Sequence, residues 1–133
     1  MKENTIKVLD DEDIEFANIL HSLGMQCKVA VIVTYLTTAG EASSREIEQA
    51  THMSQPEVCL TMRDLRGENW IDERKVTAGG KGRPSLVYTL REPVDDIIKW
   101  VEDEKLREHA EAMESIQKLR GLVSSWHRAA EPS

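Results

Sequence analysis

The stretch SQPEVCLTMRDLRGENW, residues 54–70, has the pattern of a short helix with two different faces. Ser54 is a favoured residue for capping the N-terminus of a helix. Val58, Met62 and Leu65 then follow at spacings of four and three residues, which places them along one edge of that helix. We expect this edge to be buried and the opposite face to meet solvent or a partner.

A second short helix is expected immediately before this one. In SSREIEQATHM, residues 43–53, either Ser43 or Ser44 can cap a helix of about two turns, and Glu46 is placed close to a capping box. Ile47 would then face inward. Two short helices joined by a few residues, the second with its own cap, form a helix-turn-helix.

Two strands are expected after the helix-turn-helix, over residues 70–77 and 85–90. The second contains the alternating stretch LVYTL, with Leu86 and Tyr88 on one face. The intervening AGGKGRPS, residues 78–85, holds three glycines and a proline and is too long for a tight turn. The pattern predicts a hairpin with a protruding basic tip.

Two helices are expected before the helix-turn-helix. LDDEDIEFANILHSLG, residues 9–24, begins with acids that favour the positive end of a helix dipole and ends with a glycine. Its apolar residues give one broad helical face: Ile14, Phe16, Ile19, Leu20 and Leu23. MQCKVAVIVTYLTTAGE, residues 25–41, is ambiguous because its β-branched residues also suit a buried strand. Its length favours a helix.

From Val94 to about Arg128 the sequence predicts one long helix, roughly 50 Å at 1.5 Å per residue, with Gly121 interrupting the pattern. Apolar positions gather toward its two ends and acidic residues lie between them, so no single heptad repeat runs through. An exposed apolar stripe of this length is a liability in a monomer. We therefore expect a homodimer formed through the first helix and this C-terminal helix.

Composition excludes several classes of protein. The 133 residues, 40% hydrophobic and 31% charged, suit one compact domain with an appended element. No apolar run approaches the roughly 20 residues needed to span a bilayer, and the acidic start is unlike a signal peptide. We expect a cytoplasmic protein without membrane association.

The sequence also lacks the motifs of enzymes and metal proteins. Two cysteines stand 32 positions apart and four histidines are scattered, so neither a disulfide framework nor a metal site is expected. We find no phosphate loop, nucleophile elbow or base–nucleophile pair. No cofactor and no catalytic activity are expected.

Net charge is −7, which by itself argues against nucleic acid as a partner. The charge is unevenly distributed, however, because residues 41–92 hold 8 basic and 9 acidic residues while the excess acid lies in the flanks. The central segment is therefore nearly neutral, and the placement of its cations decides the question.

The order of elements, with MSQPEVCLTMRDLRGENWIDER (residues 53–74) and GKGRPSLVYTL (residues 80–90), resembles small archaeal winged helix-turn-helix transcriptional regulators, broadly related to the ArsR, MarR and TrmB groups. The resemblance covers residues 26–92. It implies a mainly α fold with a small β-hairpin wing. Residues 1–92 would form the DNA-binding domain and residues 93–133 a long C-terminal dimerisation helix.

In such domains the second helix of the helix-turn-helix enters the major groove. On its exposed face, Gln55 can pair with adenine and Glu57 can accept a hydrogen bond from cytosine. Leu60 can meet a thymine methyl group, and Arg63 can reach guanine or a phosphate. The candidate face is completed by Ser54, Pro56 and Cys59. From these residues alone, the alternative is an ordinary solvated helix face. Oxidation of the Cys59 thiol is a further route to regulation.

Two further groups are candidates for DNA contact. Lys81 and Arg83 stand among glycines in a thin tip, which suits a narrow minor groove or phosphates, although many glycine-rich tips are simply solvated. Ser44 and Arg45, at the start of the preceding helix, can hold phosphates, although capping explains the serine equally well.

These observations lead to two hypotheses from different classes. The first is a homodimeric, sequence-specific transcriptional regulator that binds double-stranded DNA. The second is a winged-helix module that docks onto a protein of the transcription machinery without reading bases. The net charge favours the second hypothesis, whereas Lys81 and Arg83 in a glycine-rich wing favour the first.

Overall fold

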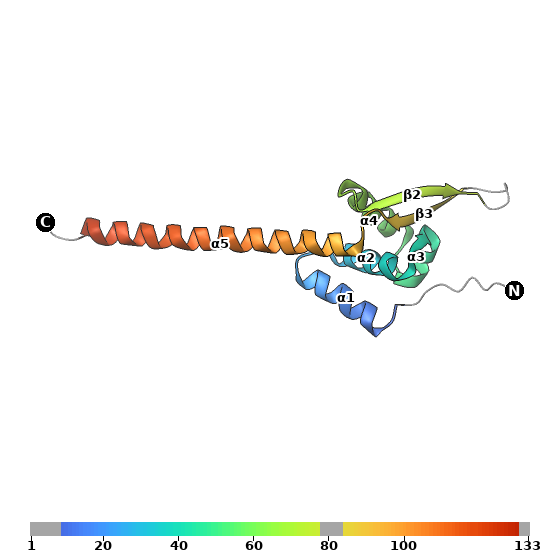
Figure 1. Cartoon of the computed structure of the whole chain (residues 1–133), viewed down its shortest axis with the longest axis horizontal. Coiled ribbons are helices and arrows are strands. Elements are labelled where there is room, and N and C mark those ends of the chain that lie inside the picture. Colours follow the sequence, from blue (N-terminus) through green and yellow to red (C-terminus); the bar gives the residue numbers. More distant parts are fainter. Residues whose placement is uncertain (1–8, 78–83, 131–133) are drawn as a thin grey trace. The chain divides into compact units, whose positions relative to one another are not determined.

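The computed structural model describes residues 9–77 and 84–130. Within them the chain is mostly helical with a small three-stranded antiparallel sheet (Figure 1). The elements in order are α1 (Asp11–Ser22), α2 (Cys27–Ala39), β1 (Glu41–Ser43), α3 (Ser44–Thr51), α4 (Gln55–Gly67), β2 (Ile71–Val76), β3 (Ser85–Leu90) and α5 (Val94–Ala130). This is the predicted winged helix-turn-helix arrangement with a long C-terminal helix. The chain divides into two compact units, Met1–Ile97 and Ile98–Ser133.

Helix α2 is the central helix of the first unit, so the helical interpretation of residues 25–41 is confirmed and the strand alternative is wrong. It packs against α1, α3 and α4, and Ile32 and Val33 are fully buried. Because α2 is buried on several sides, its sequence is apolar almost all round. Such a sequence lacks the alternation of apolar and polar residues that distinguishes a helix from a strand. Gly40, with a positive φ of 86°, ends the helix.

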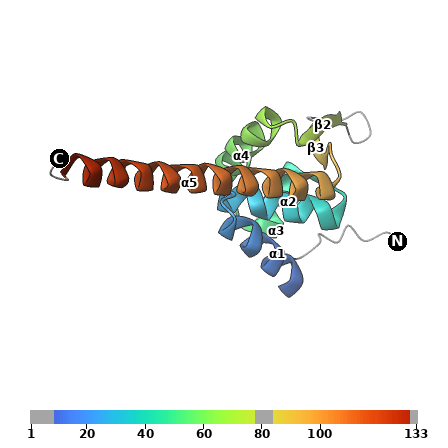
Figure 2. The ribbon, with the colours of Figure 1, turned by 60° about the vertical axis from the view of Figure 1, so that its left-hand side comes forward.

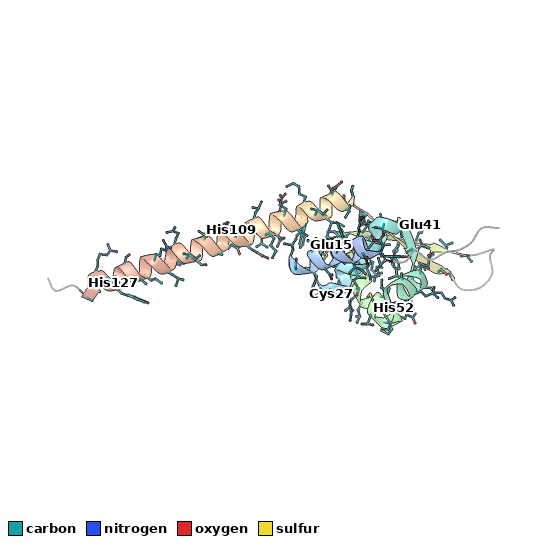
Figure 3. All side chains as sticks on the ribbon, turned by 90° about the horizontal axis from the view of Figure 1, so that it is seen from below. Glu15, Cys27, Glu41, His52, His109 and His127 are labelled. Atoms are coloured by element: carbon teal, nitrogen blue, oxygen red, sulfur yellow. The ribbon has the colours of Figure 1, made fainter. Side chains whose placement is uncertain are left out.

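Capping boxes begin both helices of the helix-turn-helix. At α3 the cap is Ser43: its Oγ accepts from the Glu46 backbone N–H at 3.1 Å, and Glu46 Oε1 accepts from the Ser43 N–H at 2.9 Å. Ser54 caps α4 in the same way. Between the helices, His52 adopts a left-handed conformation with φ 61° and closes α3 (Figure 3).

The sheet has the strand order β1-β3-β2, and both strand pairs are antiparallel. The hairpin of β2 and β3 matches the prediction to within a residue at each described end (Figure 2). Strand β1 was not predicted, because three residues are too few for an alternating pattern. It pairs with β3 so that Ala42 lies opposite Tyr88, and both are buried.

The apolar face predicted for α1 is buried only in part. Ala17 and Leu20 lie in the core, whereas Ile14, Ile19 and Leu23 are 47%, 52% and 39% exposed. The helix packs chiefly on α2, which covers one narrow side of it. Three large apolar side chains of α1 are therefore available to another surface.

Helix α5 is continuous from Val94 to Ala130, so Gly121 does not interrupt it. Only its first residues, as far as Ile97, belong to the first unit. In the second unit seven large apolar side chains from position 106 onward are exposed: Leu106, Met113, Ile116, Leu119, Leu122, Val123 and Trp126. Among the described helices none is long and apolar enough to cross a membrane.

Candidate nucleic-acid interface

Helix α4 has the two faces that its sequence predicts. Val58, Met62 and Leu65 are at most 1% exposed and form its buried edge. These contacts fasten α4 to α2 and α3. The side chains that remain outside are therefore held on a fixed helix, and their directions are set by the packing of the buried edge.

The exposed face of α4 begins at its first turn. Gln55, Cys59 and Arg63 follow one another at intervals of four residues, so they lie above one another on the helix surface and all three are exposed. Beside them Pro56 is exposed, and Leu60 is 54% exposed although it is a large apolar residue. The chain thus presents an amide, a thiol, a guanidinium and an isobutyl group together.

Glu57, the remaining predicted base contact, is engaged on both carboxylate oxygens. Oε1 accepts a hydrogen bond from the Ser54 backbone N–H at 2.9 Å, which completes the capping box. Oε2 lies 2.5 Å from Nζ of Lys28, in the first turn of α2. To accept from cytosine, Glu57 would have to share or exchange these partners.

The same contacts lower the pKa of Glu57 from 4.5 to about 2. The hydrogen bond from Lys28 is the largest cause, followed by the hydrogen bonds from the backbone and side chain of Ser54 and by the charge of Lys28. The carboxylate stays ionised at neutral pH. It also compensates the charge of Lys28 beside the N-terminal end of α4.

At the N-terminus of α3 the structure separates the two adjacent serines. Ser43 is the cap, so the hydroxyl of Ser44, the first residue of the helix, is not used for capping. Ser44 is half-buried, and the following Arg45 is exposed. Within the described part of the chain Arg45 forms no ion pair, so it remains a candidate for a phosphate.

Three arginines near the hairpin are paired with carboxylates. Arg66 Nη1 lies 3.0 Å from Glu73 Oε2. Arg74 Nη2 lies 2.6 Å from Glu41 Oε2, so this pair joins β2 to β1 across the intervening β3. Nε of Arg91 is 3.9 Å from Oδ1 of Asp72. These pairs are exposed and each stabilises little. They do reduce the positive field that a count of basic residues suggests.

The cations without a carboxylate partner among the described residues of this region are Arg45, Arg63 and Lys75. All three are exposed. Lys81 and Arg83 of the predicted wing tip lie outside the described residues, as does the rest of 78–83. The candidate interface therefore comprises the exposed face of α4, the start of α3 and the hairpin that leads to the tip.

Sequence reasoning did not find Lys28, although it touches the candidate face. It precedes Glu57 by 29 positions and belongs to a different helix, and no local pattern joins the two residues. The compensating acids Glu41 and Glu73 were missed for a similar reason. Glu41 of β1 meets Arg74 of β2 across the intervening β3, and Glu73 of β2 meets Arg66 of α4.

Other reactive groups do not gather into a site within the described residues. Cys27 and Cys59 are both free and exposed, and Cys27 is the first residue of α2 (Figure 3). His109 and His127 lie far apart along α5 (Figure 3). No cluster of three or more histidine, cysteine or carboxylate side chains suited to a metal ion occurs among the described residues.

Comparison with known proteins gives structural likenesses of low similarity. Neither a protein-family model nor a curated protein matches the sequence. A transcriptional regulator homologue from Pyrococcus horikoshii OT3 is 18% identical, with coverage of 81% of this chain and 97% of that one and a TM-score of 0.45.

Two further solved structures give similar values. NMB1585, a MarR family regulator from Neisseria meningitidis, is 14% identical over 87% of this chain and 86% of its own, with a TM-score of 0.47. The transcriptional regulator PA4135 is 16% identical over 92% and 91%, with a TM-score of 0.49. These values are too low for function to be transferred from any of the three, so the case for a function rests on the residues of this chain.

Proposed function

We propose that this protein is a sequence-specific DNA-binding transcriptional regulator that acts as a homodimer. In this proposal α4 enters the major groove, and the wing carrying Lys81 and Arg83 lies on the minor groove or the phosphates. The observation that carries it is the division of α4 into a buried edge and an exposed face that holds Gln55 and Arg63. Neither side chain forms a hydrogen bond or an ion pair with another described residue, so both are free to contact DNA.

The exposed face of α4 supports a division of roles. Gln55 lies in the first turn, the part of a recognition helix that meets base edges, and can pair with adenine. Leu60 suits a thymine methyl group. Ser44, Arg45 and the Ser54 cap would hold phosphates and fix the position of the helix without reading sequence.

We assign Glu57 a supporting role rather than base readout. Its two oxygens already serve the cap and Lys28, and a carboxylate whose pKa is about 2 keeps its negative charge near DNA. Such a charge repels phosphates unless a cation compensates it. Lys28 provides this compensation, so the pair would add little net charge to the DNA-facing side of α4.

The homodimer is supported by apolar surface on two helices. Ile14, Ile19 and Leu23 of α1 are exposed in the first unit, and nine large apolar residues of α5 are exposed in the second. Contiguous exposed apolar surface marks sites of protein association. Two copies with twofold symmetry would read half-sites separated by a whole number of DNA turns.

Selection of bound duplexes from a random pool, at a stated salt concentration, tests the proposal. We expect an enriched palindromic sequence whose affinity falls steeply with salt. Gln55→Ala should relax the preference at one base position in each half-site, and Arg83→Ala should weaken binding to all sequences alike. If the full-length protein binds no duplex with salt-sensitive affinity, the DNA-binding proposal is wrong.

A protein-interaction module is the second candidate, and the paired arginines favour it. Arg66, Arg74 and Arg91 are each matched to a carboxylate, in a chain whose net charge is −7. A surface compensated in this way suits a protein partner better than a polyanion. The same selection separates the candidates, because an interaction module should enrich no sequence from the pool.

A further inference from the structure

The centre of the exposed face of α4 is apolar. Leu60 is two residues from both Val58 and Met62, a rotation of about 200° at 3.6 residues per turn, so its side chain points away from the buried edge of the helix. Pro56 lies one turn earlier on the same side, and Cys59 lies beside both. All three are exposed, Leu60 by 54%. We call these three side chains the apolar centre.

The apolar centre has almost no capacity for hydrogen bonding. Neither the pyrrolidine ring of Pro56 nor the isobutyl group of Leu60 has a donor or an acceptor, and the thiol of Cys59 is a weak donor. The neighbouring carboxylate of Glu57 is already engaged by Lys28 and by the helix cap. A base edge that meets this centre would therefore leave its own polar groups unpaired, unless it presents an apolar group there.

The major groove of DNA offers one apolar group, the C5-methyl group of thymine. A G·C pair presents hydrogen-bonding atoms instead: N7 and O6 of guanine and N4 of cytosine. Burial of these atoms against the apolar centre without partners is unfavourable, whereas burial of a methyl group is favourable. The chemistry of the centre therefore favours A·T pairs over G·C pairs.

We propose that Pro56, Cys59 and Leu60 form a contact for the methyl groups of two thymines on neighbouring base pairs in each operator half-site. The inference rests on the proposed function, because that function places the apolar centre in the major groove. A cluster that extends over one helical turn spans about 5.4 Å, and successive base pairs of the duplex rise by about 3.4 Å, so it covers two of them. Gln55, next to Pro56 at the flank of this face, can pair with the adenine of one of these base pairs.

The charges around the apolar centre favour duplex DNA as its partner. Arg63 lies one turn after Cys59, is exposed and forms no ion pair with any described residue, so it can hold a phosphate beside the contacted bases. Arg45 at the start of α3 is also exposed and unpaired among the described residues. The exposed Asp64 lies one turn after Leu60, beyond the N-terminal part of a recognition helix that meets base edges. The part of α4 that enters the groove is therefore apolar at its centre, with an unpaired cation close by.

Replacement of single thymines by deoxyuridine tests the contact, because it removes the methyl group and leaves every hydrogen-bonding atom of the base in place. The full-length protein is titrated with the duplex selected from the random pool and with its single-uracil variants, at one salt concentration. At two neighbouring positions of each half-site we expect affinity to fall roughly two- to fivefold per methyl group, from the free energy of burying one such group. Deoxyuridine outside these positions is the control and should leave the affinity unchanged.

A double-mutant cycle with Leu60→Ala assigns the contact to this side chain. In this variant one of the two uracil substitutions should no longer weaken binding, because the partner of its methyl group has already been removed. Arg63→Ala is the matched control. It should weaken binding to the thymine and uracil duplexes by the same factor, because its guanidinium does not contact the methyl group.

5-Methylcytosine gives an independent measurement, because it carries the methyl group on a G·C pair. Exchange of a contacted T·A pair for C·G should weaken binding, and exchange for the methylated C·G pair should weaken it less, by roughly the same two- to fivefold factor. Equal affinity for the methylated and unmethylated pairs would contradict a methyl contact at that position.

The outcomes separate this inference from the proposed function. Sequence-specific, salt-sensitive binding that no uracil substitution weakens would overturn the inference and leave the proposed function standing. Equal losses in the unsubstituted chain and in Leu60→Ala at both positions would assign the methyl contact to other residues, which also overturns it. If no duplex is bound with salt-sensitive affinity, the proposed function fails, and the inference fails with it.

Discussion

Nζ of Lys28 lies 2.5 Å from Oε2 of Glu57 and joins the first turn of α2 to the first turn of α4. Together with the Ser54 cap, this contact holds the pKa of Glu57 at about 2. Because the folded pKa is lower than the ordinary 4.5, the ionised carboxylate contributes its full stabilisation above pH 4.5 and loses it as the pH falls toward about 2.

The first prediction follows from this pair. Lys28→Met should raise the pKa of Glu57 from about 2 toward 4.5, but not fully, because the hydrogen bonds from Ser54 remain. The carboxyl carbon shift of Glu57 measured by NMR against pH reports the midpoint. Lys75→Met is the matched control, since Lys75 is an exposed lysine that does not contribute to this shift. An unchanged midpoint in Lys28→Met would show that the pair is not formed in solution.

The second prediction compares two leucines on opposite faces of α4. Leu65 is 1% exposed, so Leu65→Ala should destabilise the fold by about 2 to 5 kcal/mol through lost burial and a cavity. Leu60 is 54% exposed, so Leu60→Ala should change stability by less than about 0.5 kcal/mol and weaken binding to the selected DNA. Chemical denaturation measures the stability of each variant, and DNA titration measures its affinity for the selected sequence. Equal destabilisation by both changes would contradict the assigned faces.

The third prediction compares two arginines of α4. Arg63 has no ion-pair partner among the described residues, whereas Arg66 is bound to Glu73 at 3.0 Å. Arg63→Ala should therefore reduce DNA affinity roughly 5-fold or more, by about 1 to 3 kcal/mol if it contacts a base. Arg66→Ala should have a smaller effect, because the charge of Arg66 is already compensated by Glu73 and is less available to DNA. Fluorescence anisotropy with a labelled operator gives both affinities, and the reverse order would contradict the interface.

The fourth prediction concerns Gly121, which lies inside α5. A Cβ built at this position meets no other atom within 4 Å, so alanine fits without displacement. Gly121→Ala should stabilise the helix by about 1 kcal/mol, since glycine loses more backbone freedom on folding. Hydrogen exchange of the amides around position 121 measures the change. Faster exchange in the variant would show that the glycine is needed for a close approach by another chain.

Much of the fold could be predicted because its signals are local. The caps of α3 and α4, the buried edge of α4 and the long helix all depend on residues within a few positions of one another. Strand β1 and the helical state of α2 were harder. Three residues cannot alternate visibly, and a helix buried on several sides loses its period.

The candidate interface was less predictable than the fold because its charges interact across the structure. Whether an arginine is free depends on contacts such as Arg74 with Glu41, which are 33 positions apart and meet through the sheet. Counting basic residues treats Arg63, Arg66 and Arg74 alike. The structure distinguishes them, because Arg66 and Arg74 are paired and Arg63 is not.

The exposed apolar side chains of α5 also connect the stability of this helix to the concentration of the chain. Beyond Ile97, nine of its large apolar side chains are exposed. In the proposed homodimer they would be covered only when two chains meet, so the melting temperature of the helix would rise with protein concentration. Dilution alone would then loosen the C-terminal helix.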